Sequence, residues 1–177
     1  MSIATVIGEA ATAAGLHLKQ AEVHGMSQRG GDVESDLRLS TEEIYSDLIP
    51  KGKADMIISM EPMESLRYLP YLSAEGVVIT SSKPFVNIPD YPDRDVLEAA
   101  YATLPEVYRF DIEEGALKAG NPKGANMVLL GMAAHRLEIV SAAQLRDAIK
   151  VIFAPKGEAV VESNLKAFDL GYETVQR

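Results

Sequence analysis

Residues 54–60 read Ala-Asp-Met-Ile-Ile-Ser-Met, a short and nearly continuous apolar run that is typical of a parallel strand covered on both faces. Glu61-Pro62 follows at once, and Pro62 suits the first position of a helix that we expect to extend through Leu69. Residues 76–81, Gly-Val-Val-Ile-Thr-Ser, form a second apolar run of the same kind. Strand, helix and strand at this spacing predict a βαβ unit.

After this unit the chain continues with alternating elements and then becomes helical. Prolines at positions 84, 89 and 92 indicate a surface loop over residues 83–93. Ser141 with Gln144 three residues later predicts a capping box that starts another helix. The remaining expected elements are helices over residues 95–103, 113–119, 126–137 and 157–170 and a strand over residues 107–112.

Before the unit, the pattern predicts a helix over residues 2–14 and a strand over residues 16–24. Residues 33–40 alternate apolar and polar side chains, which indicates a strand with one wet face. We expect residues 44–49 to pair back with it as an inserted β-ribbon. The predicted fold class is therefore α/β: a Rossmann-like doubly wound, mostly parallel sheet with an inserted β-ribbon and a helical C-terminal third.

Composition limits the possible functions. The 177 residues carry a formal charge of −9, which argues against nucleic acid or an anionic membrane as a partner. The chain has no cysteine, which excludes a disulfide scaffold, a thiolate nucleophile and a cysteine-bound iron–sulfur cluster on this chain. No apolar run approaches the roughly 20 residues needed to span a bilayer, and no signal peptide is evident, so we expect a cytoplasmic protein.

The most unusual stretch is Glu22–Gly31, which combines His24, Ser27, Gln28 and Arg29 with three glycines and has no hydrophobic period. Such a composition favours a loop that touches another molecule, although a glycine-rich turn with solvated side chains fits as well. Histidine carries protons near neutral pH, and arginine binds phosphate or carboxylate. A nearby Ser and His alone are weak evidence for catalysis, so we interpret the loop as a docking and binding surface.

Other polar residues leave alternatives open. Glu61 lies where a strand ends and a helix begins, which suits either a ligand site or a carboxylate that stabilises the helix N-terminus. Asn126 and Asn164 lie on apolar helix faces, where an amide usually satisfies a local backbone group. The three histidines, at positions 17, 24 and 135, show no metal-ligand spacing, so no metal site is expected.

His24-Gly25-Met26-Ser27-Gln28-Arg29-Gly30-Gly31 resembles the signature of the gamma-type subunit of 2-oxoacid:ferredoxin oxidoreductases. The spelling is similar to that of the small (beta) subunit of indolepyruvate oxidoreductase. Further similar segments follow in order over nearly the whole chain, at residues 48–50, 54–55, 61–62, 69–72, 120–121, 126–131 and 164–168.

This resemblance implies an accessory subunit of a complex that oxidatively decarboxylates a 2-oxoacid, here an indolepyruvate or another arylpyruvate, to an acyl-CoA. Electrons pass to ferredoxin, and thiamine diphosphate and iron–sulfur clusters lie on a larger partner subunit. No residue of this chain is then catalytic. The His24–Gly31 loop would face the partner or the path of coenzyme A, and Asn126, Asn164 and Glu61 become candidate interface or ligand positions.

The resemblance also implies a single gamma-type domain over residues 1–177 that lacks the family's first strand and its Gly-x-Gly-Gly-Gln-Gly turn. Our hypothesis is that the sequence lacks its natural N-terminus. A chain without that strand is expected to self-associate through an exposed sheet edge. The alternative function is a stand-alone module that binds a nucleotide or CoA without a redox partner. An independent hydrolase is disfavoured because the Gly-x-Ser-x-Gly elbow is missing.

Overall fold

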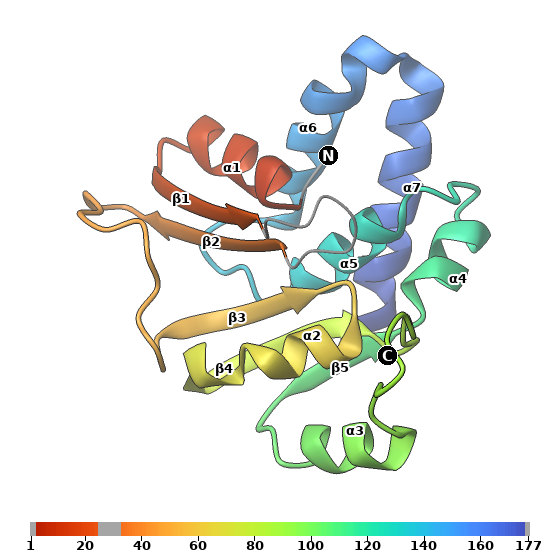
Figure 1. Ribbon diagram of the computed structural model, residues 1–177. Helices are drawn as coiled ribbons and strands as arrows, with labels where there is room; N and C mark the ends of the chain where they lie inside the picture. The colour runs from red at the N-terminus through yellow and green to blue at the C-terminus, as the bar shows by residue number, and fades with distance from the viewer. Residues whose placement is uncertain (1–2, 25–32, 176–177) are drawn as a thin grey trace.

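Three parallel strands form the central sheet in the computed structural model, which describes residues 3–24 and 33–175. They are β3 (Ala54–Ser59), β4 (Leu72–Ser81) and β5 (Val107–Phe110), in the order β3-β4-β5, so that β4 lies in the middle (Figure 1). Val78 of β4 is opposite Ile57 on one side and Val107 on the other. The predicted strand–helix–strand unit is confirmed, because α2 (Pro62–Arg67) connects β3 to β4.

Helices cover both faces of this sheet. Successive strand residues point to opposite faces, so the apolar strands present side chains to both helical layers. On one face, Ile57 and Val78 pack with the buried Leu97 and Tyr101 of α3 (Arg94–Tyr101), next to α2. On the other face, Val77 and Ile79 belong to the main core, which the helices of the last third complete. The predicted α/β class, with a parallel sheet between helical layers and a helical C-terminal part, is confirmed.

The C-terminal third packs around one buried helix. Every residue of α5 (Ala125–Ala133) from Met127 to Ala133 is buried. The predicted capping box at Ser141 is present at the start of the next helix. The remaining helices are α4 (Ile112–Lys118), α6 (Ala142–Phe153) and α7 (Glu158–Val175), with two short 3₁₀ turns, η1 (Leu69–Tyr71) and η2 (Ala154–Lys156). No helix within residues 3–24 and 33–175 is long and apolar enough to cross a membrane.

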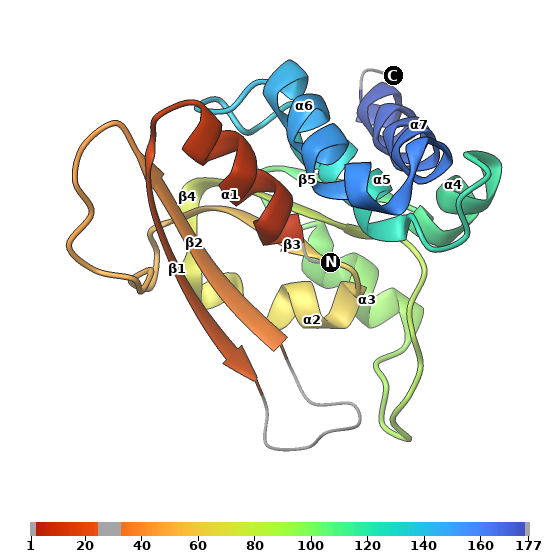
Figure 2. The same cartoon turned by 90° about the horizontal axis from the view of Figure 1, so that it is seen from above.

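The β-ribbon consists of β1 (His17–His24) and β2 (Val33–Ser40), which we call the ribbon arm. The two strands are antiparallel, and their pairing runs from His17 opposite Ser40 to His24 opposite Val33. α1 (Ile3–Ala13) packs against the arm and against α6. Figure 2 shows α1 lying alongside the two strands of the ribbon arm.

The predicted pairing of residues 44–49 with residues 33–40 is wrong, because β1 is the partner of β2 and residues 44–49 form no strand. Side chains of β2 bind the backbone of this segment instead. The Arg38 guanidinium donates to the carbonyl oxygens of Ser46 and Leu48, at 2.9 and 3.3 Å. The Asp36 carboxylate accepts a hydrogen bond from the backbone N–H of Ile49 at 3.0 Å. These bonds hold the segment as a loop beside the ribbon.

Candidate functional site

The predicted binding segment begins at the far end of the ribbon arm. His24 is the last residue of β1, and Val33, its partner in the ribbon, is the first residue of β2. The other members of the segment, Gly25, Met26, Ser27, Gln28, Arg29, Gly30 and Gly31, lie outside the described residues, as does the His24 side chain. The chain enters this segment from β1 and leaves it into β2.

The base of the ribbon arm packs against the main core. Near its base, Leu18 and Leu39 face each other across the strands and pack against the main core. Towards the far end the same face becomes polar, where the Gln20 amide donates to the Ser35 hydroxyl at 3.0 Å. The last apolar side chains, Val23 and Val33, are 58% and 62% exposed. Val33 is opposite His24 and Val23 is opposite Glu34, so these two side chains lie on opposite faces of the ribbon.

Glu61 lies at the carboxyl end of β3, and its carboxylate joins α2 to the proline-containing segment of residues 82–93, which we call the strap. Its Oε2 accepts a hydrogen bond from the Glu64 N–H at 3.0 Å and thereby caps α2. Its Oε1 accepts one from the Phe85 N–H at 3.3 Å and another from the Tyr91 hydroxyl. The structure thus shows Glu61 as the cap of a helix, one of the two interpretations that the sequence left open, and a ligand role at this edge of the sheet stays a prediction.

The surroundings of Tyr91, which include Glu61, raise the pKa of its phenol. Burial, followed by this bond and the negative charge of Glu61, raises the pKa of the Tyr91 phenol above its ordinary value of 10.0. A pKa raised in the folded state stabilises the fold below about pH 10, and this contribution is lost as the pH rises further.

We therefore expect alkaline pH to release the strap before the core unfolds. A spectrophotometric titration of tyrosinate, compared between the wild-type chain and Tyr91→Phe, checks this. The pKa values of Tyr101 and Tyr108 are raised as well, so the wild-type chain should contain one more phenol that ionises above the ordinary range than the variant does. An unchanged difference spectrum throughout that range would contradict the expectation.

A cavity of about 960 Å³ lies between the strap, α3 and the carboxyl ends of β4 and β5. This is the edge at which open α/β sheets bind ligands, and the volume is in the range of small-molecule sites. Arg109 of β5 lines it and forms a two-pronged ion pair with Glu98 of α3, with N–O distances of 2.9 and 2.6 Å. The Arg109 guanidinium also lies 4.5 Å from the centre of the Tyr101 ring.

Polar contacts fix the floor of this cavity. The buried Tyr101 hydroxyl donates to the carbonyl oxygen of Pro62 at 2.8 Å and lies 2.8 Å from the Ser65 hydroxyl. The hydrogen bond with Glu98 raises the pKa of Arg109 and lowers that of the Glu98 carboxyl. Sequence reasoning did not select Tyr101 or Arg109, because the pairing of β5 with β4 and the packing of α3 bring them together. No local motif joins them.

The two predicted asparagines lie on the helices of the last third. Asn164 of α7 is 7% exposed, and its amide donates to the carbonyl oxygen of Val160 at 2.8 Å. This is the local backbone bond that an amide on an apolar helix face usually makes. Asn126 is half-buried in the first turn of α5. A ligand or interface role for either residue stays a prediction.

The sequence and the fold agree on a family. The chain matches the pyruvate ferredoxin/flavodoxin oxidoreductase family over residues 1–174, and it therefore belongs to that family. It is 36% identical over 189 aligned positions to the indolepyruvate oxidoreductase subunit IorB of Pyrococcus horikoshii, an alignment that covers 99% of this chain and 90% of the relative.

Two solved structures have the same fold as this chain. The gamma subunit of keto/oxoacid ferredoxin oxidoreductase from Geobacter sulfurreducens superposes with a TM-score of 0.68 at 23% identity, covering 98% of this chain and 89% of that one. The 2-oxoglutarate:ferredoxin oxidoreductase from Magnetococcus marinus, solved with 2-oxoglutarate, coenzyme A and succinyl-CoA bound, gives 0.73 at 19% identity. The match covers 98% of this chain but only 28% of that longer chain.

The predicted resemblance to gamma-type subunits is thereby confirmed. The chain is a subunit of the 2-oxoacid:ferredoxin oxidoreductase class, as its family membership and its similarity to IorB indicate.

Proposed function

We propose that the chain is the small accessory subunit of an oxidoreductase that acts on an aryl 2-oxoacid such as indolepyruvate. The complex decarboxylates the 2-oxoacid, transfers the acyl group to coenzyme A and passes two electrons to ferredoxin. The similarity to IorB over nearly the whole chain is the observation that carries this proposal. His24 and Val33 lie at the end of the ribbon arm that is far from the main core, and this position supports a role of the segment between them in contacting the partner or the coenzyme A path.

The cofactors in this proposal belong to a larger partner. Iron–sulfur clusters are held by cysteine thiolates, and this chain has no cysteine. Thiamine diphosphate would supply the carbanion chemistry on the partner, while this chain's contribution is to cover or complete the site. Contact between coenzyme A and this chain is part of the proposal, with Glu61, Asn126 and Asn164 as further candidate positions.

Capture of the tagged chain from its native extract, followed by mass spectrometry, tests the proposal. We expect a large, cysteine-rich, thiamine-binding subunit to be recovered with it. Recovery of the chain alone, or only with a second copy of itself, would overturn the accessory-subunit proposal and favour a stand-alone module that binds a nucleotide or CoA.

A charged substitution at the tip of the ribbon arm gives the sharper prediction. Val33→Glu should strongly reduce recovery of the partner, because burying an unpaired carboxylate in an interface is unfavourable. Val151→Glu is the matched control, because Val151 lies on α6 and is 60% exposed, close to the 62% of Val33. Equal recovery with both variants would contradict the role of the arm.

A further inference from the structure

The strap exposes apolar side chains on both of its sides. Phe85, Val86 and Ile88 are 67%, 66% and 42% exposed. Val86 lines the cavity between the strap and α3, whereas Phe85 does not, so these two adjacent side chains point to different sides of the strap. Large apolar side chains that are exposed together in one segment, rather than scattered singly, are typical of a contact site.

The backbone of the strap also has polar groups available to another chain. Residues 84–87 belong to no helix or strand. Among the described residues, no backbone–backbone hydrogen bond involves residues 84–87. The Phe85 N–H is bound by the Glu61 carboxylate, and the other groups can bind a chain that lies alongside, as extended peptides do in recognition grooves.

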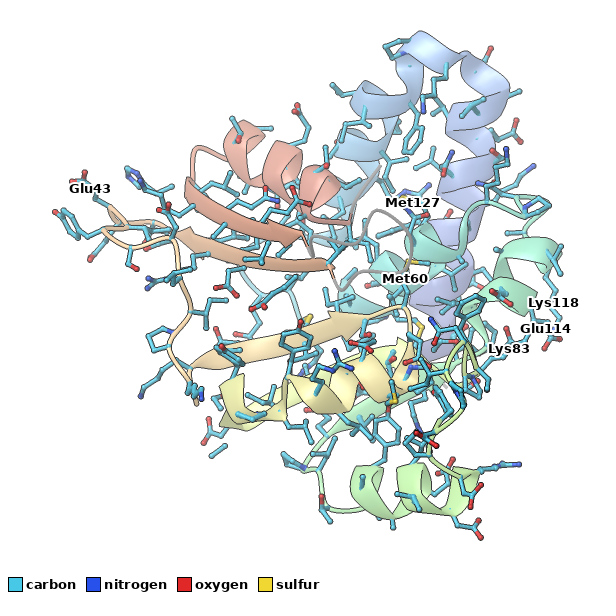
Figure 3. The ribbon with its side chains drawn as sticks, viewed as in Figure 1. Glu43, Met60, Lys83, Glu114, Lys118 and Met127 are labelled. Atoms are coloured by element: carbon cyan, nitrogen blue, oxygen red, sulfur yellow. The ribbon has the colours of Figure 1, made fainter. Side chains whose placement is uncertain are left out.

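Two acidic side chains fix the strap while its apolar side chains stay outside. Lys83 forms an ion pair with Glu113 at 2.9 Å, and Figure 3 shows Lys83 at the α4 end of the molecule. Glu61 accepts hydrogen bonds from the Phe85 N–H and the Tyr91 hydroxyl. The three prolines of the strap restrict its backbone further. A segment that is already fixed in this way loses little conformational entropy when it binds.

The charge around the strap indicates what kind of chain covers it. Asp90, Asp93 and Asp95 are exposed, and none of them forms an ion pair within residues 3–24 and 33–175. Arg94 is the only cation among residues 84–95, so negative charge is in excess there. A second copy of this chain, with its formal charge of −9, would meet this segment with like charge, which is unfavourable. A different chain with basic side chains is the complementary partner.

We propose that the strap docks into an apolar groove of the large partner subunit, with lysine or arginine side chains of that subunit along the rim. Phe85 and Val86 contact opposite walls of the groove, and the basic rim faces the three aspartates. The inference rests on the proposed function, because it assigns a further contact surface to the same partner. The chain's membership of a class of multi-subunit oxidoreductases supports the existence of such a surface.

Capture of the tagged full chain from its native extract tests the inference, with mass spectrometry to identify and quantify the large thiamine-binding subunit. The double variant Phe85→Ser/Val86→Ser should recover at least about tenfold less of that subunit, because it removes apolar contacts from the centre of the interface. Leu117→Ser/Val151→Ser is the matched control, since these side chains of α4 and α6 are 62% and 60% exposed. The control should recover the wild-type amount.

A charge reversal tests the basic rim separately. Asp90→Lys should lower recovery of the large subunit by several-fold, because it places like charges opposite each other. Asp55→Lys is the matched control, because Asp55 is exposed as well but lies near the start of β3, away from its carboxyl end. Circular dichroism of each variant verifies that it is folded before recovery is measured.

The outcomes distinguish this inference from the proposed function. If the wild-type chain does not recover the large subunit, the proposed function fails and the docking of the strap fails with it. If the wild-type chain recovers the subunit and the Phe85→Ser/Val86→Ser variant recovers as much as its control, only the docking of the strap is overturned. Equal recovery with Asp90→Lys and Asp55→Lys would overturn the basic rim. Loss of a second copy of this chain, rather than of the large subunit, from the double variant would show that the strap binds its own kind.

Discussion

Replacing Gly171 with alanine is expected to destabilise the fold by about 3 kcal/mol. A Cβ at this position would overlap the carbonyl oxygen of Val128 and lie 2.7 Å from its carbonyl carbon. These are backbone atoms of α5, so no side-chain rotation relieves the overlap. α5 and α7 would have to move apart in the centre of the main core.

Gly131 provides an independent second site for the same prediction. Its Cβ would overlap the carbonyl oxygen of Phe168 and lie 2.8 Å from the Tyr172 nitrogen, so Gly131→Ala should destabilise the fold to a similar extent. Gly8→Ala is the matched control, because the nearest atom to its Cβ would be a Leu18 methyl group at 3.7 Å. That substitution lies inside α1 and should stabilise the fold by about 0.5–1 kcal/mol.

Urea unfolding followed by circular dichroism measures all three variants. We expect the midpoint to fall for Gly171→Ala and Gly131→Ala and to rise slightly for Gly8→Ala. Wild-type stability of both core variants would show that the two helices do not approach each other this closely.

Local patterns were enough to predict most of the elements. The apolar run of residues 54–60 and the Ser141 capping box each depend on neighbouring residues, and both were recognised correctly. The segment of residues 44–49 was misassigned because its structure depends on long-range bonds from Arg38 and Asp36. No property of the segment itself distinguishes a short apolar strand from a loop whose backbone is bound by another strand.

The candidate site also has some features that neighbouring residues predict and others that depend on the tertiary structure. Glu61 was recognised because strand end and helix start are adjacent in the sequence. Its bonds to Phe85 and Tyr91 were not predictable, because they join residues separated by 24 and 30 positions. The cavity required the same tertiary information, since its wall combines the strap with α3 and β5.

Glu61→Ala is expected to lower the free energy of unfolding by about 2 kcal/mol and to loosen the strap. The substitution removes the cap of α2 and leaves the Phe85 N–H and the Tyr91 hydroxyl without their carboxylate acceptor. Hydrogen exchange of the Phe85 amide should accelerate strongly, because strap opening then no longer breaks a bond to a charged acceptor. Urea unfolding and amide exchange measure the two effects separately.

Asp111→Ala is the control that separates the two roles of Glu61, holding the strap and capping α2. Asp111 also follows a strand and caps a short helix, because its carboxylate accepts the Glu114 N–H at 2.9 Å, but it makes no bond to Phe85 or Tyr91. It should cost only about 1 kcal/mol and leave exchange at Phe85 unchanged. The excess cost of Glu61→Ala over Asp111→Ala is therefore the contribution of strap binding. Equal costs, with equal exchange at Phe85, would show that Glu61 only caps α2 and that the strap keeps its place without it.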